Sequence, residues 1–305
     1  MFSRPSCSLE YRYPLGSFHQ RRSGCFTSKT GTTMSTAHLP PELLDHIIDL
    51  LYGSQTALRD CCLVSKSWIP HTRTHLFTDV KFDTPRTLRS WKETFQDLSP
   101  SPAQYTKTLT IGCIQDVTAA DAEPGGWIRG FSRVECLAVR NTWPDGSTIS
   151  LLPFHGFSPV LKSLHVNSNY LLSPQIFDLT LSFPLLEDLD VISHNLESIG
   201  NGNGSCRPST VIQPSNQPMT GSLKLMQQEG IGFIASRLLS LSGGIHFWKL
   251  DLRCDGPDDI SSTMALVEGC SHTLEYLEIG SGFLRTPIRY PLSRLVSDFS
   301  QHRFD

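Results

Sequence analysis

The chain has 305 residues, and its 26 Lys and Arg against 29 Asp and Glu leave a formal net charge of -3. This balance provides no basic field for binding nucleic acid or an anionic membrane surface, so neither is expected as a partner and protein partners are favoured. No run of 18 apolar residues occurs, which excludes a membrane-spanning helix on length alone.

The nine cysteines are scattered and contain no C-x-x-C pair. They therefore indicate neither a disulfide framework nor a zinc site. Buried thiols in a reducing compartment are the expected state, in keeping with a cytoplasmic or nuclear location, or both.

Residues 1–38 are rich in Ser, Thr, Gly and Pro, and their basic residues face a single acid, Glu10. They show no sustained apolar period and are predicted to be disordered. A mitochondrial transit peptide is the alternative for an N-terminus that is rich in Arg and Ser and poor in acids.

A helical pattern begins at Leu39, where the Leu-Pro-Pro-Glu sequence opens a first helix. Apolar residues then follow at helical spacing up to Leu51, and Gly53-Ser54 ends the run. A second helix is predicted from Leu58 to Val64 and a third from Trp68 to Phe77. Adjacent apolar pairs make the first helix too broadly apolar for one neighbour to cover, and a unit of about 40 residues rarely folds unaided. An external partner is therefore expected.

Three segments of this unit, 39–48, 58–68 and 76–77, together resemble an F-box. The residues that carry the resemblance are Leu39, Pro40, Glu42, Leu43, Ile47, Ile48, Leu58, Cys61, Val64, Ser65, Lys66, Trp68, Leu76 and Phe77. The resemblance implies an F-box domain over 39–80 that docks on the Skp-type adaptor of a cullin ubiquitin ligase. The residues expected to contact the adaptor are Leu39, Pro40, Leu43, Leu44, Ile47, Leu51, Leu58, Val64 and Trp68. The alternative is a helical unit that only caps the domain that follows.

An amphipathic helix is predicted from Thr84-Pro85 to Leu98, and Ser99-Pro100 ends it. A repeat of short apolar-x-apolar strands follows. The first residues of these strand motifs are Leu109, Leu137, Leu164, Leu189, Leu223, Leu250 and Leu277, at steps of 28, 27, 25, 34, 27 and 27 residues. The longest step holds a Gly-, Asn- and Pro-rich stretch that predicts a disordered loop inserted at 198–219.

Helical patterns lie between the later strands, at 174–179, 231–241 and 260–267. One strand and one helix cannot bury their own apolar face, so stacked units form a continuous core. The pattern resembles a degenerate leucine-rich repeat, which implies a β-α solenoid with parallel strands over 81–305. The alternative is an ordinary α/β domain, because a parallel sheet between helices shows similar apolar runs.

The sequence shows no signal for catalysis. None of the 11 histidines has a spacing that indicates a metal site or a catalytic triad, and the alternating glycines of 200–204 lack a Lys and a strand-to-helix context. The chain is therefore expected not to be an enzyme and to need no cofactor or metal.

Outward side chains of the strands are expected to line the concave face, which is the usual binding face of a solenoid. The candidate target-binding residues are Arg140, His165, Asn167, Asp188, Asp190, Lys224, Lys249, Asp251, Arg253, Tyr276 and Glu278. Their charges are mixed, so no ligand class is implied.

The two parts together predict a substrate-recognition adaptor of a Skp-cullin-F-box ubiquitin ligase, whose partners are a Skp-type adaptor, a cullin reached through it, and a protein target. Two alternatives stay open. One is a scaffold with the same two parts that acts outside a ubiquitin ligase, and the other is an enzyme in the α/β half, which would need titratable residues converging in a pocket.

Overall fold

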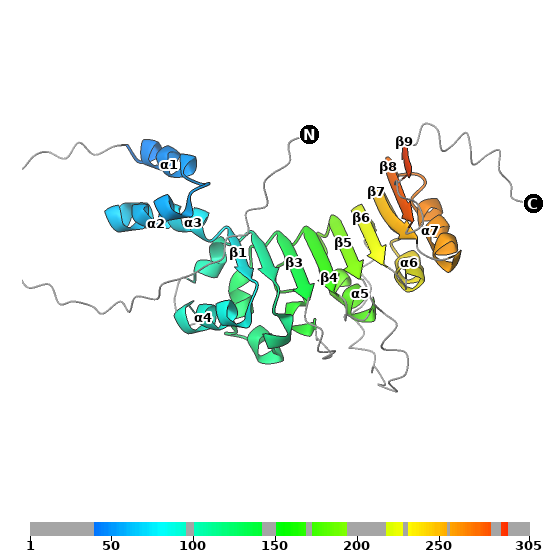
Figure 1. The fold of residues 1–305 in the computed structure, drawn as a ribbon, viewed down its shortest axis with the longest axis horizontal. Helices are drawn as coiled ribbons and strands as arrows, with labels where there is room; N and C mark the ends of the chain where they lie inside the picture. Colours follow the sequence, from blue (N-terminus) through cyan, green and yellow to red (C-terminus); the bar gives the residue numbers. More distant parts are fainter. Residues whose placement is uncertain are drawn as a thin grey trace, which may run out of the picture.

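The computed structural model describes residues 40–95, 101–141, 151–168, 173–193, 218–227, 231–254, 257–281 and 288–291. Figure 1 shows two parts within these residues, three short helices at the N-terminal end and a long sheet that continues from them. Residues 1–38, for which disorder was predicted, lie outside the described residues.

The N-terminal part consists of α1 (Pro41–Leu50), α2 (Gln55–Val64), the 3-10 helix η1 (Lys66–Trp68) and α3 (Ile69–Leu76). Three helices therefore lie where the apolar periodicity predicts them. Pro41 occupies the first turn of α1, where its missing N–H removes no helical hydrogen bond. The Ser54 hydroxyl starts α2 by accepting a hydrogen bond from the backbone N–H of Ala57 at 3.4 Å.

One nine-stranded sheet forms the rest of the described chain, and its strands lie side by side in chain order. The strands are β1 (Asp79–Phe82), β2 (Thr108–Ile111), β3 (Cys136–Asn141), β4 (Ser163–Ser168), β5 (Asp188–Ser193), β6 (Met219–Gln227), β7 (Ile245–Cys254), β8 (Tyr276–Ser281) and β9 (Ile288–Pro291). Strands β1 to β8 are parallel, and β9 pairs antiparallel with β8. The seven predicted strands and their parallel pairing are confirmed.

The inward side chains form two rows that run across the sheet, because the strand motifs lie in register. The first row contains Leu109, Leu137, Leu164, Leu189, Leu223, Leu250 and Leu277, and the second contains Ile111, Val139, Val166, Val191, Leu225, Leu252 and Ile279. All but Ile279 are buried. Since a fully buried Leu or Val contributes about 1.5–3 kcal/mol, these rows dominate the core.

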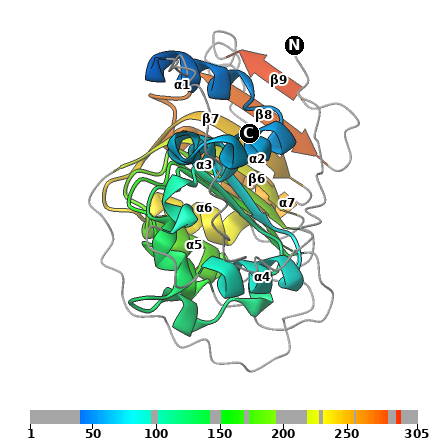
Figure 2. The same ribbon diagram turned by 90° about the vertical axis from the view of Figure 1, so that its left-hand side faces the viewer.

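Helices cover one face of the sheet and leave the other face open, as the two ribbon views show (Figures 1 and 2). The helices are α4 (Pro85–Phe95), α5 (Ser173–Leu181), α6 (Ile231–Leu239) and α7 (Pro257–Gly269). They match the four helical patterns predicted after residue 80, although the expected end of the first at Ser99-Pro100 lies outside the described residues. Their buried side chains, such as Trp91, Leu179, Leu238 and Leu266, complete the core.

Three features were not predicted. Strand β1 was missed, so the sheet begins at Asp79, two residues before the expected start of the second domain. The connections around β2 and β3 use 3-10 helices: η2 (Pro102–Tyr105), η3 (Ile114–Asp116), η4 (Ala119–Ala122), η5 (Trp127–Phe131) and η6 (Leu152–Phe154). Breakers such as Pro124-Gly125-Gly126 prevent longer helices there. The antiparallel strand β9 is possible because a short connection can reverse the chain, whereas a parallel strand needs a crossover.

The predicted insertion at 198–219 lies almost entirely outside the described residues. Its last residue, Met219, is the first residue of β6, so the expected boundary extends one residue into the sheet. Residues 218–227 then return the chain to the register of β5.

Candidate functional site

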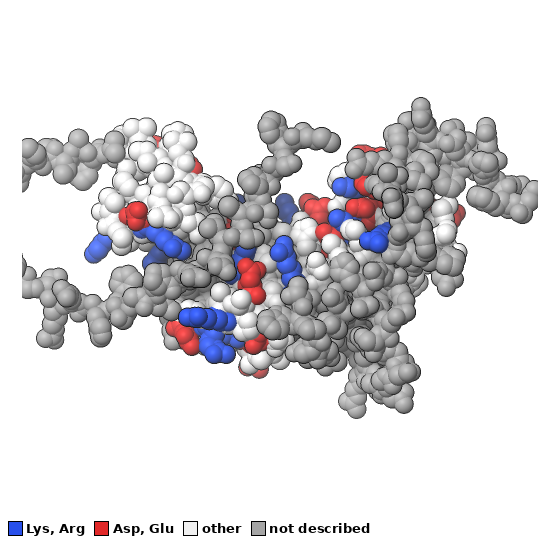
Figure 3. Space-filling model, viewed as in Figure 1, with Lys and Arg blue, Asp and Glu red and all other residues white. Residues whose placement is uncertain are grey.

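The outer face of α1 carries an apolar stripe. Leu43, Ile47 and Leu50 are 51%, 40% and 73% exposed, and their spacing of four and three residues places them on one helical face. Ile48 points the other way and is buried. White, uncharged atoms predominate over α1–α3 in Figure 3.

A second exposed apolar group lies at the end of α2. Leu63 and Val64 are 79% and 67% exposed, and no described part of the chain covers them. Large apolar side chains exposed on a small unit are one of the features by which a candidate interaction surface is recognised. We call the exposed side chains of Leu43, Ile47, Leu50, Leu63 and Val64 the apolar surface of α1–α3.

The α1–α3 part has a very small core of its own. Its buried apolar side chains are Ile48, Leu58 and Cys61, and none of them belongs to the continuous core that runs from Val80 to Leu277. A unit with so few buried side chains gains little stability from packing alone. Coverage of its apolar surface by a partner would therefore stabilise it.

The predicted adaptor-contact residues differ in how far the structure exposes them. Pro40, Leu43, Ile47 and Val64 are exposed, while Leu44, Leu51 and Trp68 are half-buried. Leu39 lies outside the described residues.

Leu58 is a correction. It is 1% exposed, because it faces the interior of α1–α3 and helps to form the core there, so it cannot contact an adaptor directly. Sequence reasoning missed two exposed side chains, Leu50 and Leu63. Leu50 could have been found from its position seven residues after Leu43, on the same helical face.

The prediction that no histidines have metal-ligating spacing is also corrected. His71 and His75 lie four residues apart on one face of α3, and their Nε2 atoms both lie next to Asp49 Oδ1 of α1. Hydrogen bonds from His71 and then His75 lower the pKa of the Asp49 carboxyl. These three residues, the His-Asp-His cluster, are the described group that could hold a metal ion.

The open face of the sheet carries the predicted target-binding residues in rows set by the strand register. One row contains His165, Asp190, Lys224, Asp251 and Glu278, on β4 to β8. His165 Nδ1 lies 3.4 Å from Asp190 Oδ2, and Lys224 Nζ lies 3.8 Å from Asp251 Oδ2. Charges of opposite sign therefore alternate across most of the row, which limits repulsion between neighbouring strands.

The adjacent row contains Ser163, Asp188, Ser222, Lys249 and Tyr276. Asp188 accepts hydrogen bonds from the Ser163 hydroxyl at 3.1 Å and the Ser222 hydroxyl at 2.5 Å. Lys249 Nζ lies 5.3 Å from the centre of the Tyr276 ring, and the Tyr276 hydroxyl donates to Glu278 at 2.7 Å. These contacts hold the side chains in place before any ligand arrives.

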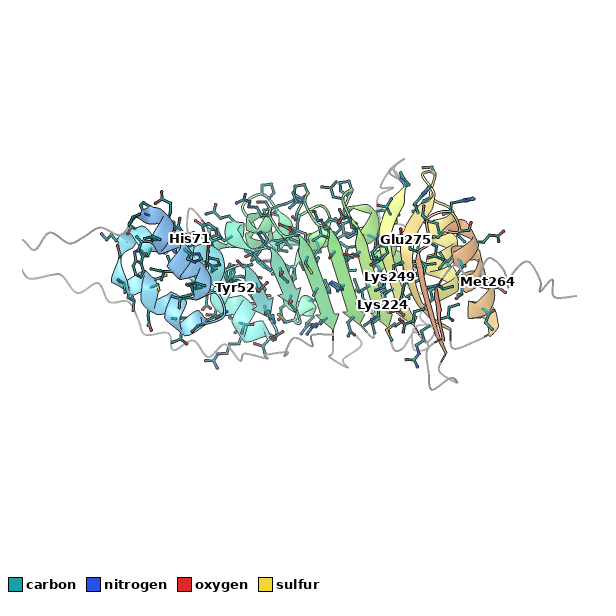
Figure 4. The ribbon with its side chains drawn as sticks, turned by 90° about the horizontal axis from the view of Figure 1, so that it is seen from above. Tyr52, His71, Lys224, Lys249, Met264 and Glu275 are labelled. Carbon is teal, nitrogen blue, oxygen red and sulfur yellow. The ribbon has the colours of Figure 1, made fainter. Side chains whose placement is uncertain are left out.

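The two rows enclose a hollow of about 260 Å³, whose polar lining includes His165, Asp188, Asp190, Lys224 and Lys249. Lys224 and Lys249 lie side by side on the open face in Figure 4, and charges of both signs gather there in Figure 3. Asp190 Oδ1 is buried and has no hydrogen-bond partner among the described residues. A buried carboxylate oxygen of this kind accepts its hydrogen bond from a water molecule or from another donor that enters the hollow.

Five predicted residues do not line this hollow, namely Tyr276 and Glu278 on β8, and Arg140, Asn167 and Arg253. Arg140 and Asn167 are paired in register on β3 and β4, toward the ends of the strands, and Arg253 lies at the corresponding end of β7. Arg140 is exposed, and the other two are half-buried. These three residues border the open face beyond the hollow.

The His165 side chain carries a charge on this face at neutral pH. The hydrogen bond to Asp190, followed by one to Cys136, raises the pKa of His165 to about 10. Three strands away, on β7, burial raises the pKa of the Asp251 carboxyl, and Lys224 opposes that change.

The raised pKa predicts a pH dependence. Because His165 binds its proton more tightly in the folded protein, protonation stabilises the fold. This contribution is complete below the pKa of about 6.5 in the unfolded chain, and it is lost as the pH rises toward 10. Replacing His165 with Gln should therefore cost stability at pH 6 and little at pH 10. The difference should be about 1 kcal/mol or less, because solvent screens this half-exposed pair. Denaturant unfolding of the parent and of His165→Gln at several pH values measures it, with His246→Gln on β7 as the control for removing an exposed imidazole. Parallel pH profiles for the parent and His165→Gln would contradict the prediction.

Comparisons with known proteins do not assign this chain to a family. A scan against protein-family models finds no match, and a search of curated proteins finds no relative. Among the described residues, no helix is long and apolar enough to cross a membrane.

Proposed function

We propose that this chain is an F-box-type substrate adaptor of a Skp-cullin-F-box ubiquitin ligase. In this proposal, α1–α3 form the F-box and dock on a Skp-type adaptor. The sheet with its helices forms a leucine-rich-repeat-like solenoid, and its open face binds a protein target. The chain itself catalyses no reaction, because the other subunits of the ligase transfer ubiquitin.

The observation that carries the proposal is the apolar surface of α1–α3. Five large aliphatic side chains are exposed on a unit that buries only three apolar side chains of its own. Burial of apolar surface is the dominant favourable term in most protein–protein association, so covering these side chains with a partner would contribute to binding. The same segments carry the resemblance to the F-box, so the geometry and the sequence pattern favour the same partner.

The sheet geometry supports the second half of the proposal. Its strands lie in chain order, the eight parallel ones align their inward apolar residues in register, and the described helices cover a single face. This arrangement is typical of repeat proteins, in which each unit contacts only its neighbours. It leaves the opposite face free along several strands.

The chemistry of the open face favours a protein segment as the target. The hollow presents carboxylates, lysines and an imidazole within one space. A peptide offers both donors and acceptors along its backbone and side chains, so it matches this mixture better than a ligand of one charge.

Reconstitution with purified subunits tests the proposal. We expect the full chain to bind a Skp-type adaptor in a pull-down, and to bring a cullin into the complex only when that adaptor is present. An adaptor complex that excludes the cullin would favour the scaffold outside a ubiquitin ligase. Failure to bind the adaptor would overturn the F-box assignment.

A further inference from the structure

The His-Asp-His cluster places three metal-ligating atoms at the corners of a small triangle. His71 Nε2 and His75 Nε2 lie 2.9 Å and 2.8 Å from Asp49 Oδ1, and 3.3 Å from each other. His71 and His75 share one face of α3 because four residues make about one helical turn, and Asp49 comes from the last turns of α1. Figure 4 shows His71 in this helical part of the chain, with Tyr52 nearby.

No placement of protons gives a favourable hydrogen bond between all three pairs of atoms in this triangle. If both rings donate from Nε2 to Asp49 Oδ1, their two N–H groups crowd each other across the 3.3 Å edge. If one Nε2 instead accepts a proton from the other ring, its lone pair faces the Asp49 carboxylate at less than 3 Å. A cation shared by the three atoms removes both conflicts, because each atom then directs a lone pair at positive charge.

The dimensions also fit a metal ion. Tetrahedral zinc with Zn–N bonds of about 2.0–2.1 Å separates its nitrogen ligands by about 3.3–3.4 Å, which matches the distance between the two Nε2 atoms. The Asp49 oxygen needs to retreat by only a few tenths of an ångström, and its side chain is half-exposed and able to do so.

The surroundings of the cluster resemble the outer shell of a metal site. Asp45 Oδ1 lies 3.6 Å from His71 Nδ1, just beyond hydrogen-bond distance, on the side from which a carboxylate orients a ligating imidazole through its second nitrogen. The Tyr52 ring packs edge-on against the His75 ring, with centroids 5.5 Å apart, and restricts its rotation. His75 is also the least exposed of the three ligands.

We propose that Asp49, His71 and His75 form a zinc-binding site that joins α1 to α3. Two imidazoles and one carboxylate suit zinc among the common divalent ions, whereas calcium and magnesium prefer oxygen ligands throughout. Water occupies the fourth position, on the exposed side. The bound ion cross-links two helices whose shared core is small, and so stabilises α1–α3.

Zinc titration of the full chain tests the site. After treatment with a chelator, the parent should bind Zn²⁺ in isothermal calorimetry, and the zinc should raise the melting temperature of the helical signal. Asp49→Asn and His75→Gln should each weaken that binding by at least about tenfold. His46→Gln, which changes an exposed histidine of α1 outside the cluster, should bind like the parent.

Two further measurements keep the result interpretable. Circular dichroism of each apo variant shows whether it is folded, and Asp49→Asn is the variant least able to disturb packing, because Asp49 is exposed. Cobalt substitution separates this site from the cysteines, since thiolate ligands produce a strong charge-transfer band and this ligand set does not. Equal zinc affinity in the parent and in folded Asp49→Asn and His75→Gln, or a thiolate band from the bound cobalt, would overturn the proposal.

Discussion

Replacing Leu43 or Ile47 with Asp should weaken binding to a Skp-type adaptor at least about 30-fold. Truncating an apolar anchor at the centre of an interface often costs about 2 kcal/mol or more, which is about 30-fold in the dissociation constant. An introduced carboxylate adds the cost of removing its charge from water. Both side chains are exposed in the free chain, so the substitutions should leave its fold intact. Calorimetry or surface plasmon resonance with a purified adaptor gives the dissociation constants.

A matched control is available on the sheet part of the chain. Leu185, just before β5, is 52% exposed, almost the same as Leu43, so Leu185→Asp introduces the same charge at the same exposure away from α1–α3. It should bind the adaptor like the parent, and so should Asp190→Asn on the open face. Adaptor binding by Leu43→Asp and Ile47→Asp that equals the parent's would show that α1–α3 are not an F-box.

Replacing Gly221 with Ala should destabilise the sheet by at least about 3 kcal/mol, because two penalties combine. Gly221 has a φ of +103°, which side chains with a Cβ rarely adopt. An added Cβ would also overlap the backbone carbonyl oxygen of Glu187, on the neighbouring strand segment, and lie 2.5 Å from its carbonyl carbon. Relief requires β5 and β6 to separate where Ser222 N–H donates to Glu187 O at 2.7 Å.

Gly280→Ala is the control for this substitution. Gly280 is also in a strand, β8, but a Cβ there would meet no atom within 4 Å and its backbone is not left-handed. The free energy of unfolding of the Gly280→Ala variant should differ from the parent's by less than about 1 kcal/mol. Guanidinium unfolding followed by circular dichroism compares the two variants with the parent. A midpoint for Gly221→Ala that matches the parent's would show that β5 and β6 do not approach this closely.

Sequence periodicity predicted the elements that bury their own apolar side chains. Leu137, Leu164 and Leu189 each begin an apolar-x-apolar motif, and the pattern alone indicated strands whose inward positions could align. Helix α1 was predicted in the same way, from a proline in its first turn and apolar residues at helical spacing. Local backbone preference and burial favour the same structure in these segments, so a single sequence suffices.

Strand β1 and the short connections were harder to predict. Asp79–Phe82 has only four residues and two buried side chains, and it becomes a strand because β2 supplies its hydrogen bonds. The antiparallel strand β9 likewise depends on the edge that β8 presents. Such segments contain too little periodicity to identify themselves, and their structure follows from their neighbours.

The residues of the sites depended most on the tertiary structure. Sequence placed Leu58 among the contact residues and missed Leu50, because an apolar pattern indicates that a side chain will be covered but not by which partner. The spacing of His71 and His75 was visible in the sequence, whereas Asp49 lies 22 residues earlier and reaches them only when α1 packs on α3. His165 and Asp190 are 25 residues apart and meet only through strand register. Sequence alone therefore determined the helices and strands with a clear apolar period, since these depend on residues close in the chain. Packing of distant segments decided which side chains share a surface or a site, because only contact in space sets those distances.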